Sequence, residues 1–328
     1  MLYVNNNDIT DPRINLAIEE HILRNLTVTE PIVLFYVNDP SVIIGRNQNS
    51  IEEIDPDYIE ANSINLVRRL SGGGAVYHDH GNLNFSFVTD GARDLHNFSK
   101  FNDPIIAALR GLGVDAELRG KSDIFADGKK ISGNAQYASK GRMFSHGTLL
   151  FDTNLEHLLK AINPRGAVIE SKAVQSIRNF VTNIRELLPQ DMTIEELRTA
   201  LLAALFDGNV VEYELTAVDW QKIHTIARDR FGSWDWNVGH APKFNVQTSE
   251  RLPIGKVDAR VSVDSGHIQG LKLYGDFIGE CEVSELESEL RGVRYQEDAV
   301  RERLQIINLN EYFGELSPDD FLHLLSLK

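Results

Sequence analysis

The sequence holds a single cysteine, Cys281, among its 328 residues. One thiol can form neither an internal disulfide nor a cysteine-rich metal site. The ten histidines do not show the His-Glu-x-x-His spacing, and Gly-x-Ser-x-Gly is absent as well. These absences disfavour a disulfide scaffold, a zinc hydrolase and a serine hydrolase of that type. They favour a reducing, cytoplasmic location.

Long hydrophobic runs and excess basic charge are also lacking. The longest apolar run, residues 31–37, has the length of a buried strand and falls far short of the ~18 residues of a membrane span. Nor does the N-terminus show the basic and apolar segments of a secretion signal. Lysine and arginine number 33 against 48 acidic residues, a net charge of −15. Charge repulsion therefore disfavours nucleic acid and membrane partners.

The elements expected from residue patterns are a mixture of short strands and helices. Asp11-Pro12 predicts the start of a helix in which Ile14, Ile18 and Ile22 form one buried stripe. Strands are expected over residues 32–37, 42–44, 66–70 and 76–88, and helices over 102–112, 155–161 and 193–205. The elements do not alternate regularly, which favours an α+β fold over a doubly wound one.

A polar stretch containing Pro253 marks the expected domain boundary, because 328 residues suggest about two domains. We predict a large domain over residues 1–246 and a small C-terminal domain over 247–328. In the small domain a strand is expected over 257–263, with helices over 284–290 and 298–304 and a last one beginning at Ser317-Pro318.

The first candidate site is a glycine loop in a stretch of sequence without acidic residues. Between Ala61 and Tyr77 no acidic residue occurs, yet Arg68 and Arg69 are followed by Ser71-Gly72-Gly73-Gly74. Successive glycines let backbone amides approach and surround an anion. The loop matches neither a Walker A nor a Rossmann motif. A tight or bulged hairpin is the alternative, and the two arginines favour anion binding.

The second candidate site is a predicted β-hairpin around Asp127-Gly128, the preferred type I′ turn. The turn pairs Ala126 with Lys129, Phe125 with Lys130, and, further along, residue 124 with 131 and 123 with 132. Asp123 and Lys130 thereby become diagonal neighbours within ion-pair reach. A surface ion pair is the alternative to a functional lysine. In a later strand, His146 and Thr148 point the same way, as do Val76 and His78.

Together these residues resemble the lipoate-protein ligase family, specifically its bacterial two-domain A type, over the whole chain. The stretches that match the family are residues 68–79 with 81–84, 44–49, 130–135, 146–149, 171–183 and 234–237. It implies an α+β fold, with a large mixed-sheet domain of the biotin/lipoate ligase catalytic fold and a small α/β C-terminal accessory domain.

The resemblance also implies a two-step, ATP-dependent reaction. Lipoate and ATP would give lipoyl-AMP and pyrophosphate, and a carrier lysine would then take the lipoyl group and release AMP. The implied acceptors are lipoyl domains of 2-oxoacid dehydrogenase acyltransferase subunits and the glycine cleavage H protein. Joining a carboxylate to a triphosphate brings two anions together, so cations, including Mg²⁺, are expected in the site.

The site residues that the resemblance implies begin with Lys130, as the catalytic lysine that contacts the carboxyl oxygen and the α-phosphate. Asp123 would hold Mg²⁺ or orient Lys130. One departure is Lys121-Ser122-Asp123, where the family commonly has Arg-Asn-Asp. The residues implied to bind ATP or lipoyl-adenylate are Arg69, Ser71, Gly72, Gly73, Gly74, Ala75, Val76, Tyr77, His78, Asn82, Lys130, Ala135, His146 and Thr148.

Two other functions compete with the ligase. The first is a cysteine-independent or carrier-to-carrier lipoyl or octanoyl transferase. An amidotransferase of this kind would carry the acyl group on an activated thiolate, for which only Cys281 is available. A lipoate-binding module without adenylation would not need Lys130 and Arg69, which this chain retains. A biotin ligase is disfavoured because its Gly-Arg-Gly-Arg-type loop is missing.

Overall fold

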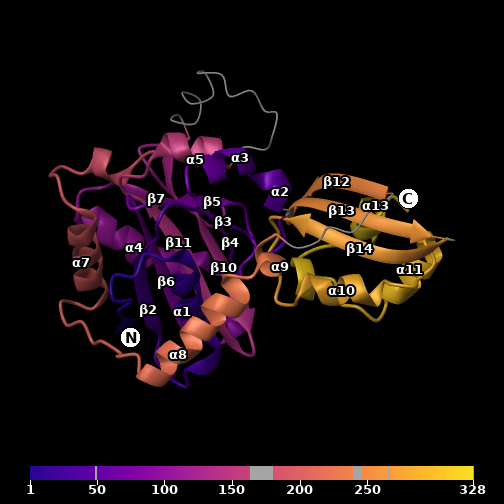
Figure 1. Ribbon diagram of the computed structural model, residues 1–328, viewed down its shortest axis with the longest axis horizontal. Coiled ribbons are helices and arrows are strands. Elements are labelled where there is room, and N and C mark those ends of the chain that lie inside the picture. The colour runs from indigo at the N-terminus through magenta and orange to yellow at the C-terminus, as the bar shows by residue number, and fades with distance from the viewer. Residues whose placement is uncertain (49, 163–179, 239–245, 265, 328) are drawn as a thin grey trace. The chain divides into compact units, whose positions relative to one another are not determined.

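The computed structural model describes residues 1–48, 50–162, 180–238, 246–264 and 266–327 (Figure 1). The chain divides into two compact units. The first contains Met1–Ile44, Ser50–Arg69 and Ala75–Asn237, and the second contains Gly45–Asn49, Leu70–Gly74 and Val238–Lys328. No helix of the described residues is long and apolar enough to cross a membrane. The boundary between residues 246 and 247 stays a prediction.

The first unit is built on a five-stranded sheet of order β1-β2-β6-β11-β10, in which only β1 and β2 run parallel. Its strands are β1 (Leu2–Val4), β2 (Ile32–Val37), β6 (Asn82–Asp90), β10 (Asn134–Ser139) and β11 (Arg142–Leu150). Two three-stranded sheets adjoin it in the same unit. They are β4-β3-β5, with β3 (Ser41–Ile44), β4 (Asn65–Arg68) and β5 (Val76–His78), and β7-β8-β9, with β7 (Ala116–Arg119), β8 (Asp123–Ala126) and β9 (Lys129–Ser132).

Helices cover both faces of the five-stranded sheet. The described helices of this unit are α1 (Pro12–Asn25), α2 (Ser50–Glu53), α3 (Pro56–Ala61), α4 (Phe98–Gly111), α5 (Leu155–Ala161), α7 (Ile194–Leu205), α8 (Ala217–Ile226) and α9 (Trp234–Asn237). Short 3₁₀ turns form at Ala92–Asp94 and Ile184–Leu187, and a π-helical turn, Ala227–Phe231, continues α8. The mixed sheets with helices confirm the predicted α+β class.

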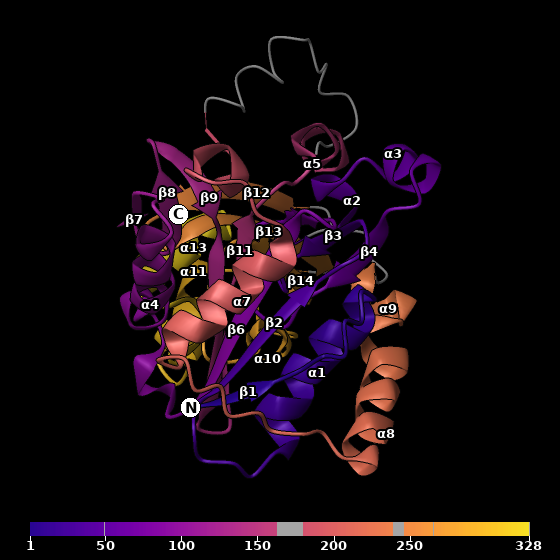
Figure 2. The same ribbon diagram turned by 90° about the vertical axis from the view of Figure 1, so that its left-hand side faces the viewer.

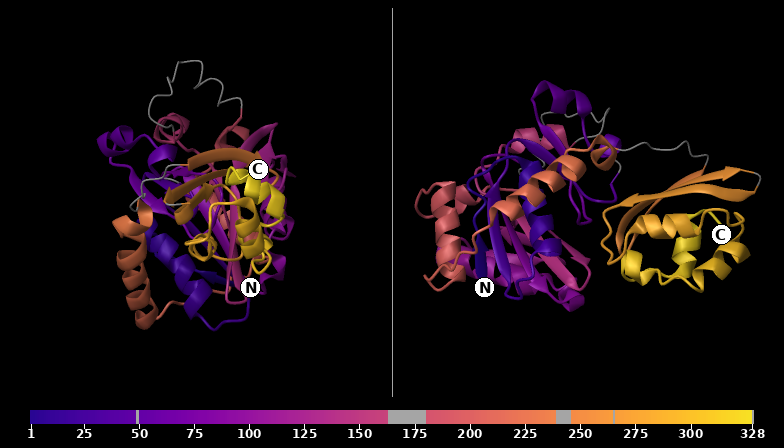
Figure 3. Two further views of the ribbon diagram at one scale, coloured as in Figure 1. Left: turned by 90° about the vertical axis from the view of Figure 1, so that its right-hand side faces the viewer. Right: turned by 60° about the horizontal axis from the view of Figure 1, so that its bottom comes forward.

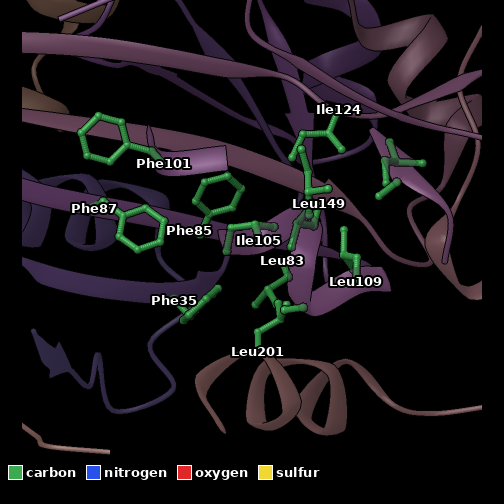
Figure 4. Packing of buried hydrophobic residues seen from close by; sticks show 14 of the residues in the cluster. Phe35, Leu83, Phe85, Phe87, Phe101, Ile105, Leu109, Ile124, Leu149 and Leu201 are labelled. Atoms are coloured by element: carbon green, nitrogen blue, oxygen red, sulfur yellow. The ribbon is translucent and has the colours of Figure 1, made fainter. Parts of the chain in front are cut away.

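Alternation along β6 sorts its side chains between two buried faces. Leu83, Phe85 and Phe87 enter the apolar core beneath α4 and α7 (Figure 4). The polar residues Asn84 and Ser86 point to the other face, which α1 covers, so they are buried as well. A row of polar groups inside a protein requires hydrogen-bond partners or a ligand. This covered polar face is therefore a candidate ligand site.

Helix α1 begins as its sequence predicts, with Asp11 accepting a hydrogen bond from the backbone N–H of Arg13. The prediction of one buried stripe is wrong, because Glu19, Glu20 and His21 are buried along with Ile18 and Ile22. The helix packs against the sheet on one side and against α8 on another (Figure 2). Periodicity along one helix cannot reveal that a second helix covers its polar side.

The strand expected over residues 76–88 is two strands in two different sheets. The chain turns at Asp79, whose carboxylate accepts hydrogen bonds from the N–H groups of Gly81 (2.9 Å) and Asn154 (2.8 Å). At Gly81 a Cβ atom would lie only 2.0 Å from the carbonyl oxygen of Asp152. This close backbone approach requires glycine and ends the first strand.

The hairpin of β8 and β9 has the predicted turn, with Asp127 and Gly128 at φ +49° and +72°. The pairs Ala126–Lys129 and Phe125–Lys130 form as predicted. Beyond them the predicted register is wrong, because a β-bulge makes Ile124 face Ser132. The bulge accommodates Ile131 as an extra residue, and both Ile124 and Ile131 are fully buried in the core.

The second unit is an antiparallel sheet with helices on one face (Figure 3). Its strands are β12 (Val246–Leu252), β13 (Gly255–Asp264) and β14 (His267–Gly275), and its helices are α10 (Val283–Glu289), α11 (Glu297–Leu304), α12 (Asn310–Phe313) and α13 (Pro318–Leu324). The predicted strand and the three predicted helices are confirmed, and Ser317 caps α13. Alternate residues of β13, beginning with Val257, form a core with Leu286 and Phe321.

Candidate functional site

The covered polar face of the large sheet gathers four of the predicted site residues. Ala135 lies opposite His146 in the β10–β11 pair, and Thr148 lies opposite Asn84 in the β11–β6 pair. Asn82 follows on the same face of β6, where its amide donates to Asn84 Oδ1 (3.0 Å). Strand pairing therefore brings these residues, distant in sequence, onto one surface.

A buried carboxylate, that of Glu19 in α1, organises this face. Glu19 is 2% exposed, accepts a hydrogen bond from the hydroxyl of Tyr36 (3.1 Å) and lies 3.0 Å from Nδ1 of His146. Burial and the neighbouring carboxylate of Glu19 raise the pKa of Tyr36 well above its ordinary value. The phenol is therefore neutral and donates, which holds Glu19 beside His146.

Arg69 supplies a buried positive charge next to this group. It is 5% exposed, and its guanidinium donates to the carbonyl oxygen of Ile43 (3.0 Å). Burial lowers the pKa of Arg69 to about 10, with Tyr36 and Glu19 acting in the opposite direction. At neutral pH the side chain therefore stays cationic.

His78 has a ring nitrogen for which the described residues provide no hydrogen-bond partner. Its Nδ1 lies 2.9 Å from the amide nitrogen of Asn38, which identifies Nδ1 as an acceptor and leaves the proton on Nε2. That Nε2 is buried and has no hydrogen-bond partner among the described residues. Burial, together with Arg69 and His146, lowers the pKa of His78 to about 3. A neutral imidazole with a free N–H is suited to bind an acceptor atom of a ligand.

Lys130 forms the predicted ion pair with Asp123. Its Nζ lies 2.8 Å from Asp123 Oδ2, and the two side chains are 36% and 32% exposed, so the pair remains accessible to a ligand. The lysine stem folds over Gly133, where a Cβ would lie 3.3 Å from both Cε and Nζ. Thr148 fixes this glycine, since its Oγ1 accepts from the Gly133 N–H (3.2 Å).

A distant segment also holds the backbone of Lys130. Its N–H donates to the carbonyl oxygen of Phe180 (2.7 Å), and its carbonyl accepts from the N–H of Thr182 (3.2 Å). The segment belongs to the family-like stretch 171–183, of which residues 171–179 lie outside the described residues. Phe180 and Thr182 therefore hold the backbone of β9 at Lys130.

The departure at Ser122 leaves the main chain anchored. The carbonyl oxygen of Ser122 accepts hydrogen bonds from the amides of Asn134 (2.7 Å) and Asn102 (3.1 Å). These contacts use the backbone of residue 122 and not its side chain. The main chain next to Asp123 is therefore anchored without the family's usual asparagine, and the hydroxyl of Ser122 donates to Asp123 Oδ1 (3.4 Å).

The glycine loop falls in the second unit. Ser71 is fully buried, and its carbonyl accepts from the N–H of Arg46 (2.9 Å). Gly73 has φ +91°, a conformation that favours glycine. At Gly72 a Cβ would lie 2.2 Å from the carbonyl oxygen of Phe277, so this position excludes any side chain. Gly74, the last loop residue, is exposed.

Three predicted residues follow this loop in the first unit. Ala75 and Val76 are half-buried, and Val76 begins β5. The side chain of Tyr77 packs in a separate apolar cluster and stacks on His157, with ring centroids 6.2 Å apart. Because neighbours in a strand point to opposite faces, the Tyr77 side chain lies away from that of His78.

The predicted Mg²⁺ ligand, Asp123, lies beside Lys130. No group of three or more His, Cys, Asp or Glu side chains suited to a metal is found among the described residues. Mg²⁺ bound to a substrate triphosphate needs only one or two carboxylates, since phosphate oxygens and water complete its shell. Asp123, which is partly exposed, meets that need.

Cys281 lies in surroundings that do not activate a thiol. Burial and the acidic neighbours Glu311, Glu285 and Glu280 raise its pKa. An acyl-transferring cysteine requires the opposite, a thiolate stabilised by basic groups. The environment of the only thiol in the sequence thus argues against the amidotransferase alternative.

Sequence patterns do not identify Glu19 and Tyr36 as site residues. In the sequence, Glu19 belongs to a charged run between two isoleucines, and a charged run normally marks the solvated face of a helix. Tyr36 lies within the apolar run of β2. Only the packing of α1 onto the sheet brings the two side chains together.

Comparisons with known proteins identify the family. Residues 11–206 match the family model of the lipoyl protein ligase A/B catalytic domain, and residues 241–325 match that of the bacterial lipoate protein ligase C-terminus. The chain is 52% identical to the lipoate-protein ligase LplJ of Bacillus subtilis (strain 168) over 330 residues, covering 99% of this chain and all of the relative.

Solved structures show the same relationship. A crystal structure of lipoate-protein ligase A bound with ATP is 33% identical, with a TM-score of 0.61 over 73% of this chain and 97% of that one. P. falciparum LipL1, crystallised with lipoate, shares the fold at 24% identity, with a TM-score of 0.77 and 94% coverage of both chains. The chain belongs to the lipoate-protein ligase family.

Proposed function

We propose that this ligase joins lipoate to ATP at the covered polar face and the β8–β9 hairpin, and that Lys130 stabilises the reacting groups. The observation that carries the proposal is the Lys130–Asp123 pair of 2.8 Å, which keeps an ammonium group ordered but accessible. A triphosphate entering this position would offer Lys130 a stronger anionic partner than one carboxylate.

The chemistry at Lys130 is electrostatic. As the lipoate carboxylate attacks the α-phosphorus, negative charge builds on the phosphoryl oxygens, and pyrophosphate leaves. An ammonium group fixed near the carboxyl and α-phosphate oxygens lowers the energy of that charge. The lysine forms no covalent bond with the substrate, and Gly133 and Thr148 keep its stem in place.

The remaining polar groups would bind and orient the substrates. Arg69 provides a permanent positive charge, and the free Nε2–H of His78 provides a neutral donor. Glu19 and Tyr36 would fix the ring of His146 near the bound molecule. Asp123 would hold Mg²⁺, which neutralises phosphate charge when it is bound. Backbone amides of Ala75 and Val76, which belong to the same unit, would complete the anion site.

The second half-reaction transfers the lipoyl group to a lysine of a carrier protein, with AMP as the leaving group. We propose lipoyl domains of 2-oxoacid dehydrogenases and the glycine cleavage H protein as the acceptors. Incubation of lipoyl-adenylate-loaded enzyme with each purified carrier, followed by mass spectrometry, measures which of them gains the lipoyl group.

Lipoate-dependent exchange of labelled pyrophosphate into ATP tests the first half-reaction. A ligase catalyses this exchange, whereas an amidotransferase or a lipoate-binding module does not. Lys130→Met should reduce exchange by ~10²–10³-fold, the usual effect of removing one donor to developing charge. The matched control is Lys129→Met on the opposite strand face, which should retain exchange. Near-normal exchange by the Lys130 variant would contradict the role of this lysine.

A further inference from the structure

The end of strand β4, at Arg68, is held by hydrogen bonds from a segment 168 residues further along the chain. We call this set of hydrogen bonds the clamp. Strand β4 is an edge strand, since it pairs only with β3 in the sheet order β4-β3-β5. Its last residue, Arg68, therefore has backbone groups on the open side that no neighbouring strand can pair. An uncovered edge of this kind can pair with another chain, so proteins usually cover it.

Helix α9 supplies the missing partners. The Arg68 N–H donates to Oδ1 of Asn237 (2.9 Å), and the Arg68 carbonyl accepts from the indole N–H of Trp236 (2.8 Å). In return, the Arg68 guanidinium donates to the carbonyl oxygens of Trp236 (2.8 Å) and Asn237 (3.1 Å). Two residues thus hold the main chain and the side chain of Arg68 at once.

The clamp is itself firmly supported. The guanidinium of Arg230 lies 4.8 Å from the ring centroid of Trp236, and Arg230 forms an ion pair (2.9 Å) with buried Glu20 of α1. The amide of Asn237 donates to the carbonyl oxygen of Phe231 (2.8 Å), the last residue of the π-helical turn. Rare π-helical turns commonly mark functional positions.

We propose that Trp236 and Asn237 are positioning residues for lipoate binding, which they serve by fixing Arg68 and, through it, Arg69. This inference rests on the proposed role of Arg69 in the substrate site. Arg69 follows Arg68 directly, and its own N–H donates to the carbonyl of Ile44 (3.0 Å). A displacement of ~1 Å at a binding group can reduce a rate 10²-fold, so release of the clamp should be measurable.

The test is the dissociation constant of lipoate, measured by calorimetry on the full chain, for wild type and Trp236→Phe. Phenylalanine keeps an aromatic ring beside Arg230 and removes the indole N–H that donates to Arg68. We expect the dissociation constant to rise about tenfold while the melting temperature changes little. Trp220→Phe in α8 is the matched control and should bind lipoate as wild type does.

A double-mutant cycle with Arg69→Lys distinguishes an effect of Trp236 that acts through Arg69 from a general loss of rigidity in the protein. If Trp236 acts through Arg69, its substitution should add little to the loss already present in the Arg69→Lys protein. Three results would each overturn the proposal. They are losses of lipoate affinity that add in the double mutant, an unchanged dissociation constant in Trp236→Phe, and a loss of binding that a smaller fraction of folded protein explains. Absence of lipoate binding and of pyrophosphate exchange in wild type would instead refute the proposed function.

Discussion

His78 makes the stability of this protein depend on pH in a direction that its environment predicts. Its pKa falls from the ordinary 6.5 to about 3 in the folded protein. Between these values the unfolded chain binds a proton at His78 and the folded chain does not. Acidification therefore favours the unfolded chain, and the stability is lost as pH falls below 6.5.

The magnitude follows from the same two values. Each pKa unit corresponds to about 1.4 kcal/mol, so lowering the pH from 7.5 to 5 should remove about 2 kcal/mol through His78 alone. The site is buried, which leaves this effect unscreened by solvent. His78→Gln cannot take up a proton and should lose about 2 kcal/mol less than wild type over the same range.

Urea unfolding at pH 7.5, 6 and 5 measures the difference between the two proteins. Equal m values would show that both unfold in the same transition. His80→Gln is the matched control, since His80 is largely exposed, and it should follow wild type. Equal losses of unfolding free energy in wild type and His78→Gln would refute the assignment of His78 as a buried, neutral imidazole.

Three further substitutions test the site. Cys281→Ser should leave lipoate-dependent pyrophosphate exchange unchanged, and a large loss would revive the thioester alternative. Gly133→Ala should lower exchange about tenfold, because a methyl group would press on the Lys130 stem, whereas Gly111→Ala, which meets no neighbour, should not. Asp123→Asn should raise the Mg²⁺ concentration needed for half-maximal exchange, and an unchanged Mg²⁺ requirement would exclude Asp123 as a ligand.

Local signals made much of the fold predictable. Asp11-Pro12, the Thr193 capping box and Ser317-Pro318 start helices where expected, because each supplies a side-chain acceptor for free backbone N–H groups. Asp127-Gly128 forms the expected turn, which brings Lys130 to Asp123. These features depend on a few neighbouring residues, and the sequence contains all of them.

What could not be predicted depends on contacts between distant segments. The burial of Glu19 requires α1 to pack onto the sheet, and that of His21, which lies 2.9 Å from Asp219, requires α8 to cover α1. The bulge at Ile131 reflects packing of two isoleucines into one core. The end of β5 depends on the approach of Asp152 to Gly81, some seventy residues away. Periodicity within one element contains no information on such neighbours.

A crystal structure with a non-hydrolysable lipoyl-adenylate analogue tests the central claim most directly. We predict that Lys130 Nζ will lie within ~3.2 Å of an oxygen of the phosphoryl or acyl group, with Arg69 and His78 Nε2 also turned toward the ligand. An analogue bound in the large unit with Lys130 still paired to Asp123 and out of reach of those oxygens would contradict it.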